Sequence, residues 1–126
     1  MTKKTYTPEG TAVVGPYSPA VEAGNLIYFS GQIPIDSATG KIVEGDIKVQ
    51  TQQCLKNLAN LLSAAGVTSD DIVKTTVYLT NIEDFKAVNE VYGEFFEAPY
   101  PARTAIAVVA LPLGAKVEIE VIALRT

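Results

Sequence analysis

Hydrophobic and polar positions alternate in two short segments near the start of the chain, and the spacing then becomes helical. Residues 20–23 and 26–31 have the pattern of strands, and Gly24-Asn25 between them suits a hairpin turn. Residues 46–65 carry hydrophobic side chains three or four positions apart, and Gly66 supplies a stop signal. The first half of the chain therefore predicts a β-hairpin followed by an amphipathic helix.

The next segment is rich in β-branched residues and predicts a strand over 72–80. Its alternation places four side chains on one face: Val73, Thr75, Val77 and Leu79. A second helix follows, capped by Asn81 and stopped at 99–101. Its buried stripe is predicted to contain Ile82, Phe85, Val88, Tyr92, Phe95 and Phe96. Asn89 lies beside that stripe.

Two further strands, at 104–111 and 116–124, complete the chain, with a turn at 112–114 between them. The order is strand, strand, helix, strand, helix, strand, strand, with no long linker and no repeat. Two helices can cover only one face of the resulting sheet. The other face still carries hydrophobic groups, so we expect a second copy of the chain to cover part of it.

Length and composition favour a single globular domain spanning residues 1–126. Hydrophobic residues make up 48% of the chain and charged residues 19%, which is ordinary for a folded domain. The formal net charge of −4 argues against a phosphate-binding surface, so no nucleic-acid partner is expected. The N-terminus resembles no secretory signal and no segment approaches membrane-spanning length. The sequence therefore predicts a cytoplasmic protein that does not enter membranes.

The residue types that are absent restrict the possible chemistry. There is no histidine, which removes catalytic triads and most zinc sites. The one cysteine, Cys54, cannot form an intrachain disulfide or a thiolate metal site, and it lies in the hydrophobic stripe of the first helix. We expect Cys54 to be a core residue, and we expect no metal site.

Arg103 is one of only two arginines, and it opens an almost unbroken hydrophobic run. A guanidinium holds a carboxylate with two parallel hydrogen bonds and is costly near a core without a partner. Two interpretations therefore stand side by side. Arg103 either forms a structural ion pair with Glu118 or Glu120, or it binds an anionic small molecule.

Glu118 and Glu120 lie on one face of the last strand, and valine and isoleucine lie on the other. The simplest interpretation is a face exposed to solvent, because glutamate is seldom buried. Ile122 and Leu124 continue the same face, however, which is more typical of a protein interface.

Three further features are unremarkable individually. Tyr17 lies in a stiff loop between Pro16 and Pro19, Ser30-Gly31 ends a strand, and Asn89 is a helix residue. Taken in order and spacing, five segments of this chain closely resemble the reactive-intermediate deaminase family, also called Rid or YjgF. The segments are Gly15-Pro16-Tyr17-Ser18, Ser30-Gly31-Gln32-Ile33-Pro34, Val73-Lys74-Thr75-Thr76-Val77-Tyr78, Pro101-Ala102-Arg103 and Val117-Glu118-Ile119-Glu120. The resemblance runs from about Gly15 to Arg125.

The resemblance implies a chorismate-mutase-like α+β fold with two helices on one face of a mixed sheet, assembled as a homotrimer with clefts between subunits. It also implies an activity without a metal or organic cofactor: hydrolysis of reactive 2-imino or 2-enamino acids, such as 2-aminoacrylate, to 2-oxo acids and ammonia. Such compounds arise from pyridoxal-phosphate-dependent dehydratases acting on serine or threonine, which links the protein functionally to those enzymes.

The resemblance also implies residue roles. Arg103 would hold the substrate carboxylate, and Glu118 would orient or activate the attacking water. Tyr17, supplied by a neighbouring subunit, would line the same cleft with Ser30, Gly31 and Asn89. Ala105 occupies the position where many members carry a cysteine. That departure leaves the roles of the arginine and the glutamate intact but bears on substrate preference.

Three other functions remain open at this point. The same pocket would suit a binding protein for small 2-oxo acids, in which Arg103 clamps the ligand and Glu118 only supports it. An RNA-directed activity is disfavoured by the acidic charge and the lack of a basic, aromatic stripe. A purely structural trimer would tolerate replacement of Arg103 with loss of stability alone.

Overall fold

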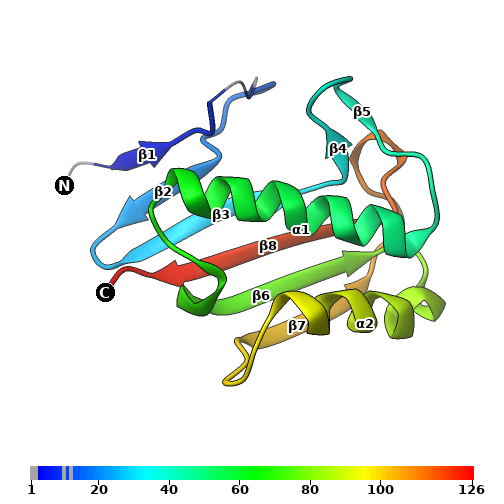
Figure 1. Cartoon of the computed structure of the whole chain (residues 1–126). Helices are drawn as coiled ribbons and strands as arrows, with labels where there is room; N and C mark the ends of the chain where they lie inside the picture. Colours follow the sequence, from blue (N-terminus) through cyan, green and yellow to red (C-terminus); the bar gives the residue numbers. More distant parts are fainter. Residues whose placement is uncertain (1–2, 10, 12) are drawn as a thin grey trace.

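One mixed sheet with helices on a single face forms the framework of the protein, seen in a computed structural model that describes residues 3–9, 11 and 13–126 (Figure 1). The strand order in the six-stranded sheet is β1-β2-β3-β8-β6-β7. The strands are β1 (Lys4–Tyr6), β2 (Ala20–Ala23), β3 (Leu26–Gln32), β6 (Ile72–Leu79), β7 (Ala102–Ala107) and β8 (Val117–Leu124). β6 and β7 pair in parallel, and the other neighbouring pairs are antiparallel. A separate pair, β4 (Ile35–Asp36) and β5 (Lys41–Ile42), forms a small second sheet.

Two α-helices lie side by side on one face of the sheet, α1 (Ile47–Ala64) and α2 (Phe85–Phe95) (Figure 1). Asp46 caps α1 by accepting a hydrogen bond from the backbone N–H of Val49 at 3.0 Å. Gly66, with φ at 76°, ends the same helix in the left-handed conformation that glycine adopts readily. Three short 3₁₀ turns complete the helical part: η1 (Ser69–Asp71), η2 (Ile82–Asp84) and η3 (Pro112–Gly114).

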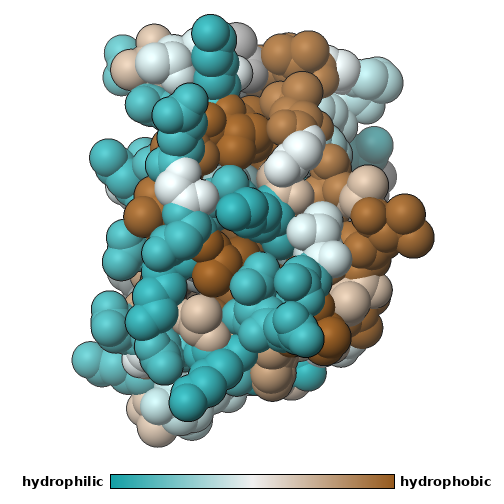
Figure 2. Space-filling view, turned by 90° about the vertical axis from the view of Figure 1, so that its right-hand side faces the viewer, coloured by the Kyte–Doolittle hydropathy of each residue, from teal (hydrophilic) through white to brown (hydrophobic). Residues whose placement is uncertain are grey.

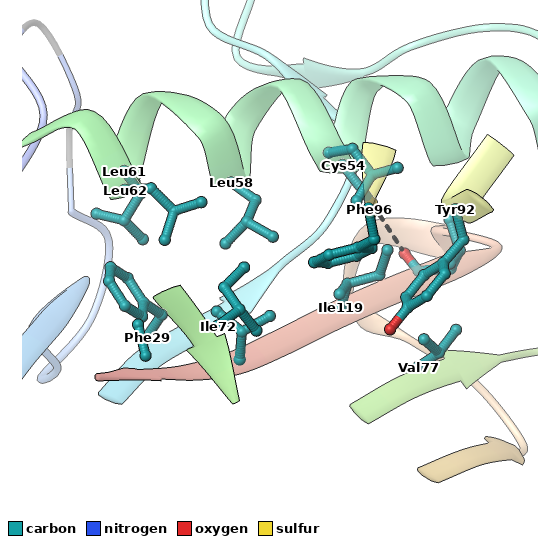
Figure 3. Close-up of a cluster of buried hydrophobic side chains, with 14 of the residues drawn as sticks. Phe29, Cys54, Leu58, Leu61, Leu62, Ile72, Val77, Tyr92, Phe96 and Ile119 are labelled. Carbon is teal, nitrogen blue, oxygen red and sulfur yellow. Dashed lines mark hydrogen bonds between the residues drawn. The ribbon is translucent and has the colours of Figure 1, made fainter. Parts of the chain in front are cut away.

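The core lies between the helices and the sheet. The central strands β8 and β6 direct every second side chain towards α1 and α2, and the two helices close the layer from above (Figure 3). The side chains that are almost completely buried include Ile27, Leu58, Leu61, Leu62, Val77, Leu79, Val88, Val117 and Ile119. This two-layer arrangement confirms the predicted α+β class with two helices on one face.

A β-bulge in β6 changes which face of the sheet one predicted residue lies on. The pairing of β6 with β8 shifts by one residue between Ile72 and Lys74, so both Val73 and Lys74 turn away from the core. Val73 is 43% exposed, whereas Thr75, which the alternation placed on the same face, is buried. An alternating pattern of side chains does not reveal the extra residue of a bulge. The pattern is regular on either side of the bulge and shifts by one position only at the bulge itself.

The ends of several elements also differ from the sequence-based prediction. Ile82 is 55% exposed, because it lies in η2 before α2 begins and not in the buried stripe of that helix. The strand predicted at 104–111 is β7, which begins at Ala102 and ends at Ala107, opposite Leu79 at the end of β6. Strands β1, β4 and β5 were not predicted, because two or three residues carry too little periodicity to detect.

The second face of the sheet has no helix over it. Seen from the end of the molecule that lies to the right in Figure 1, hydrophobic residues gather along one side and hydrophilic residues along the other (Figure 2). The exposed or partly exposed residues of this open face include Tyr28, Ile106, Ile122 and Leu124. Within the described part of the chain, no helix combines the length and hydrophobicity needed to cross a bilayer.

Candidate active site

Arg103 lies on the edge strand β7, on the side of the sheet that faces α2. Its register partner on β6 is Thr75, which is buried beneath the helices. The Arg103 guanidinium donates a hydrogen bond from Nη1 to Oδ1 of Asn89 at 2.6 Å. The guanidinium carbon also lies 4.8 Å from the ring centre of Tyr92 and 5.3 Å from that of Phe85. Residues of α2 therefore hold the guanidinium in place from two directions.

The guanidinium has no acidic partner in the described residues. The ion pairs found there join Lys48 to Glu90 and Arg125 to Glu22, and neither includes Arg103. The structural ion pair with Glu118 or Glu120, which the sequence left open, is therefore not formed within one chain. Arg103 keeps the capacity to bind a carboxylate with its remaining N–H groups.

A cavity of about 350 Å³ adjoins the guanidinium. It lies between α2 and the segment that leads into β7, and its lining consists of Asn89, Tyr92, Gly93, Tyr100, Pro101 and Arg103. The volume is near the lower end of the range of small-molecule sites, roughly 300–1,000 Å³. Aromatic and amide groups thus surround one strong cation, which is suited to a small anionic ligand.

Glu118 lies on the opposite, open face of the sheet, at a β-bulge in the neighbouring strand. The pairing of β3 with β8 shifts by one residue between Phe29 and Gln32. The bulge brings the backbone of Gly31 against the Glu118 side chain, so that a Cβ at position 31 would overlap Glu118 Oε2. A larger residue at position 31 would therefore displace the Glu118 carboxylate from this place.

Burial raises the pKa of the Glu118 carboxyl above its usual value, and the charge of Glu120 raises that pKa further. Glu120 itself accepts a hydrogen bond from the Tyr78 hydroxyl at 2.7 Å. The neighbouring carboxylate therefore has a fixed partner, and Glu118 is in an environment where it can exchange a proton with a reactant.

Ser30 links this carboxylate to the loop that carries Tyr17. The Ser30 hydroxyl donates to the carbonyl oxygen of Ser18 at 2.7 Å, and its backbone N–H donates to that of Pro19 at 2.8 Å. Tyr17 is 55% exposed, so its ring is available for contact with a ligand or another chain. Ser30, Gly31 and Glu118, with the Tyr17 loop, therefore form one group of candidate residues.

Cys54 lies under this group, on the core side of the sheet. Its side chain lies among the labelled core residues (Figure 3). Its Sγ is 3.3 Å from the carbonyl oxygen of Gln32, which follows Gly31, and 3.6 Å from that of Val117, which precedes Glu118. Burial, with a smaller contribution from the Glu118 charge, raises the pKa of the thiol well above its usual value. Cys54 is a buried core residue, which confirms the interpretation from its position in the helical stripe.

The candidate residues thus form two groups that do not meet within one chain. Arg103 and Asn89 lie on the helix side. Ala105 lies on the same side, because it is the register partner of the buried Val77 and packs against the core. Glu118 belongs to the open face, because its register partner is Tyr78 and the intervening Val117 and Ile119 are buried.

Sequence reasoning missed several residues of these groups. Tyr92 was assigned only to the hydrophobic stripe of α2, and its partner role towards Arg103 has no separate signal in the sequence. Gly93 and Tyr100 line the cavity, and Tyr78 donates a hydrogen bond to Glu120.

In the described residues, no three His, Cys, Asp or Glu side chains are grouped so that they would hold a metal ion.

Comparison with known proteins places this geometry in a family. A family model described as Endoribonuclease L-PSP matches residues 8–125. A RutC family protein of Pyrococcus horikoshii is 47% identical over 99% of this chain and 99% of its own length. A mouse protein named 2-iminobutanoate/2-iminopropanoate deaminase is 45% identical over 94% of this chain and 88% of its own.

Solved structures agree with these sequence matches. The crystal structure of a Yersinia pestis protein of the conserved Rid family superposes with a TM-score of 0.94, at 46% identity over 98% of this chain and 99% of that one. The match covers the strands and helices that carry both groups of candidate residues. The chain belongs to the Endoribonuclease L-PSP family, that is, to the Rid/YjgF family of reactive-intermediate deaminases.

Proposed function

We propose that this protein hydrolyses reactive 2-imino acids, and their 2-enamino tautomers such as 2-aminoacrylate, to 2-oxo acids and ammonia. The observation that carries the proposal is the Arg103 guanidinium, held by Asn89 and Tyr92 at the edge of a cavity without an acidic partner in the described residues. A 2-imino acid supplies the carboxylate that this cation lacks. The names of relatives at about 45% identity support the same reaction class.

The chemistry needs positioning and one proton-transfer group. Water adds to the imine carbon, and the electron pair of the C=N bond moves to nitrogen, giving a carbon that bears both hydroxyl and amine. Glu118 takes one proton from the attacking water and passes it to the imine nitrogen, which gives this intermediate. Glu118 then takes the hydroxyl proton and delivers it to the amine, so that the C–N bond breaks, ammonia leaves and the C=O bond forms. Arg103 holds the carboxylate throughout, which aligns the imine carbon with the water.

A second copy of the chain completes the site in this proposal. Arg103 and Glu118 lie on opposite faces of one sheet, so a ligand bound to Arg103 meets Glu118 only from another subunit. The hydrophobic open face provides the surface for that contact. We therefore propose a homotrimer with sites between subunits, in which Glu118, Gly31, Ser30 and the Tyr17 loop of one copy face Arg103, Asn89 and Ala105 of the next.

The direct test is an imine hydrolysis assay. The imine is generated in place, either by an amino-acid oxidase or by a pyridoxal-phosphate-dependent threonine dehydratase, and 2-oxo acid and ammonia are followed in time. We expect both products to appear faster with the protein than in buffer alone. Absence of any acceleration across several imines would reject the deaminase activity, and measurable binding of a 2-oxo acid in that case would favour a metabolite-binding protein.

The pH dependence tests the role of Glu118. If ionised Glu118 is the base, activity rises with pH through its pKa, which lies above the usual value of 4.5 because of burial and the Glu120 charge. Glu120→Gln removes that charge but keeps an oxygen that can accept from Tyr78. We therefore expect the acid limb of the kcat/KM profile to move to lower pH in Glu120→Gln, after the rate in buffer is subtracted at each pH.

The native protein and a Tyr78→Phe variant are the comparisons for this profile. Tyr78→Phe removes the hydrogen bond but leaves the Glu120 charge, so its acid limb is expected to remain above that of Glu120→Gln. An unchanged acid limb in Glu120→Gln would show that Glu118 is not the group being titrated.

A further inference from the structure

Three polar side chains on α1 form a row that faces the sheet. Gln50, Cys54 and Asn57 are spaced four and three residues apart, so they lie on one face of the helix. Gln50 and Cys54 are buried in the layer between α1 and the sheet. A buried polar group is costly unless it is hydrogen-bonded, so the partners of this polar row indicate what it does. α1 lies across β3 and β8 (Figure 1), and the partners belong to the backbone at the ends of these two strands.

At β8 the polar row reaches the two residues that come before Glu118. Oε1 of Gln50 accepts a hydrogen bond from the backbone N–H of Lys116 at 2.9 Å. Sγ of Cys54 lies 3.6 Å from the carbonyl oxygen of Val117. The backbone is therefore held from the helix side immediately before the residue that carries the carboxylate.

At β3 the polar row reaches the segment that follows Gly31. Nδ2 of Asn57 donates to the carbonyl oxygen of Ile33 at 3.1 Å and to that of Ile35 at 2.9 Å. Both carbonyls lie beyond Gln32, the last residue of β3, which pairs with β8. Asn57 thus anchors the chain at the point where it leaves the sheet.

These contacts lie on either side of the β-bulge that sets Gly31 against Glu118. Strand pairing fixes β3 up to Phe29, where the register shifts, and Asn57 holds the chain after the bulge. A bulge interrupts the ladder locally, so its geometry depends on neighbouring contacts. Glu118 belongs to the open face and the polar row to the helix side, so the row acts on the carboxylate through the backbone of the sheet.

We propose that Asn57 and Gln50 are positioning residues for Glu118, because they hold the two backbone segments whose close approach fixes the carboxylate against Gly31. The inference rests on the proposed deaminase function and adds to it a role for residues that contact neither substrate nor Glu118. Without either hydrogen bond, the ends of β3 and β8 separate at the bulge. Water then enters beside the carboxylate, and its alignment with the reactant is lost.

The test measures Glu118 directly and then the reaction. Protein labelled with carbon-13 in the glutamate carboxyl groups is titrated by NMR, and the resonance missing from Glu118→Gln identifies Glu118. Asn57→Leu keeps the approximate size of the side chain but removes both donors, and Gln50→Met removes the acceptor. Asn60→Leu makes the same change at an exposed position of α1 and is the matched control. Circular dichroism and the mass in solution verify the fold and assembly of each variant.

We expect the Glu118 carboxyl to titrate at lower pH in Asn57→Leu and in Gln50→Met than in native protein. Burial is the largest cause of its raised pKa, and water that enters beside Gly31 weakens that cause. Asn60→Leu is expected to titrate like native protein. A loss of overall stability alone would not move the titration, because the resonance belongs to the folded molecules.

None of these substitutions on α1 changes the other titratable groups around Glu118. Those groups are the Glu120 carboxyl, the Tyr78 hydroxyl and the Cys54 thiol. A shifted titration therefore reports solvation of the Glu118 carboxyl and not the loss or gain of a neighbouring charge.

The kinetic expectation is a fall in kcat without a matching rise in KM. A reacting group misplaced by about 1 Å can cost about 100-fold in rate, so we expect kcat for imine hydrolysis to fall between about tenfold and 100-fold in Asn57→Leu. KM is expected to stay within about twofold, because Arg103 holds the carboxylate from the other face of a sheet. Gln50→Met is expected to show the same division, and it decides the matter if Asn57→Leu does not fold.

The outcomes separate this proposal from the deaminase function. If imine hydrolysis is accelerated and either the Glu118 titration or kcat is unchanged in both variants, the positioning role is overturned while the deaminase function stands. An equal effect in Asn60→Leu would overturn it too, because any leucine placed on α1 would then act alike. If native protein accelerates no imine hydrolysis, the deaminase function fails, and the role in catalysis fails with it even where the titration shifts.

Discussion

Replacing Arg103 with alanine is expected to lower kcat/KM for 2-imino acids by about 100-fold or more, while the protein stays folded. The reason is that the substrate carboxylate would lose its charge-assisted hydrogen bonds, and truncating one partner of a buried charge pair costs about 2–5 kcal/mol. Arg103 is exposed and forms no ion pair in the described residues, so its removal leaves no buried charge unpaired. The measurement is 2-oxo acid formation from imine generated in place, with thermal unfolding recorded for each variant.

Two further substitutions make this result specific. Arg103→Lys keeps the charge but cannot form two parallel hydrogen bonds, so we expect an activity between those of native protein and Arg103→Ala. Lys86→Ala removes an exposed cation from the same helix that contacts Arg103, and it is expected to leave activity unchanged. Equal losses in Arg103→Ala and Lys86→Ala would mean that overall charge, and not a carboxylate clamp, determines the rate.

The second large effect is the recovery of activity from two inactive variants. Arg103→Ala and Glu118→Gln each remove one side of the proposed site, and those sides lie on opposite faces of the sheet. If a site takes Arg103 from one subunit and Glu118 from the next, exchange of subunits between the two variants creates some sites with both native residues. Random mixing in equal amounts in a cyclic assembly is expected to restore about a quarter of native activity, since each native partner is present with a chance of about one half.

The control for this experiment is a double variant carrying both substitutions on one chain. Mixing that double variant with native protein dilutes native sites and creates no recovery above the native fraction. If the two single variants are mixed, and native mass spectrometry verifies exchange, yet activity stays at the level of each alone, then each site is built within one chain. That result would contradict the intersubunit site.

The sequence predicted the fold well where a regular period was long enough to detect. Helix α1 and the alternation of Glu118 with buried Val117 and Ile119 were both predicted correctly. The exposure of Val73 was not predicted, because a bulge inserts one residue into β6 and turns Val73 away from the core. The assignment of Ile82 to the buried stripe was wrong because a 3₁₀ turn precedes α2 and changes which residues face the core.

The sequence predicted which residues belong to the candidate site, but it did not predict how those residues are arranged in space. Arg103, Asn89 and Glu118 were named from the sequence, and their roles are still proposals. Which of them share a face depends on the register of three strands, and a sequence pattern does not specify register between strands that are distant along the chain. The contact of Arg103 with Tyr92 also joins β7 to α2, and neither residue signals that contact by its type.

The bulge in β3 makes the number of residues in that strand as important as their identity. Substitution of Ser30 would keep Gly31 against Glu118, because the register on both sides of the bulge is set by pairing with β8. Deletion of a single residue there would instead extend the regular register of the first half of β3 through its second half, and Gly31 would lose its place beside the carboxylate. A one-residue deletion can thus remove the site while the hydrophobic core is retained, so gaps in this strand are more damaging to function than most point changes.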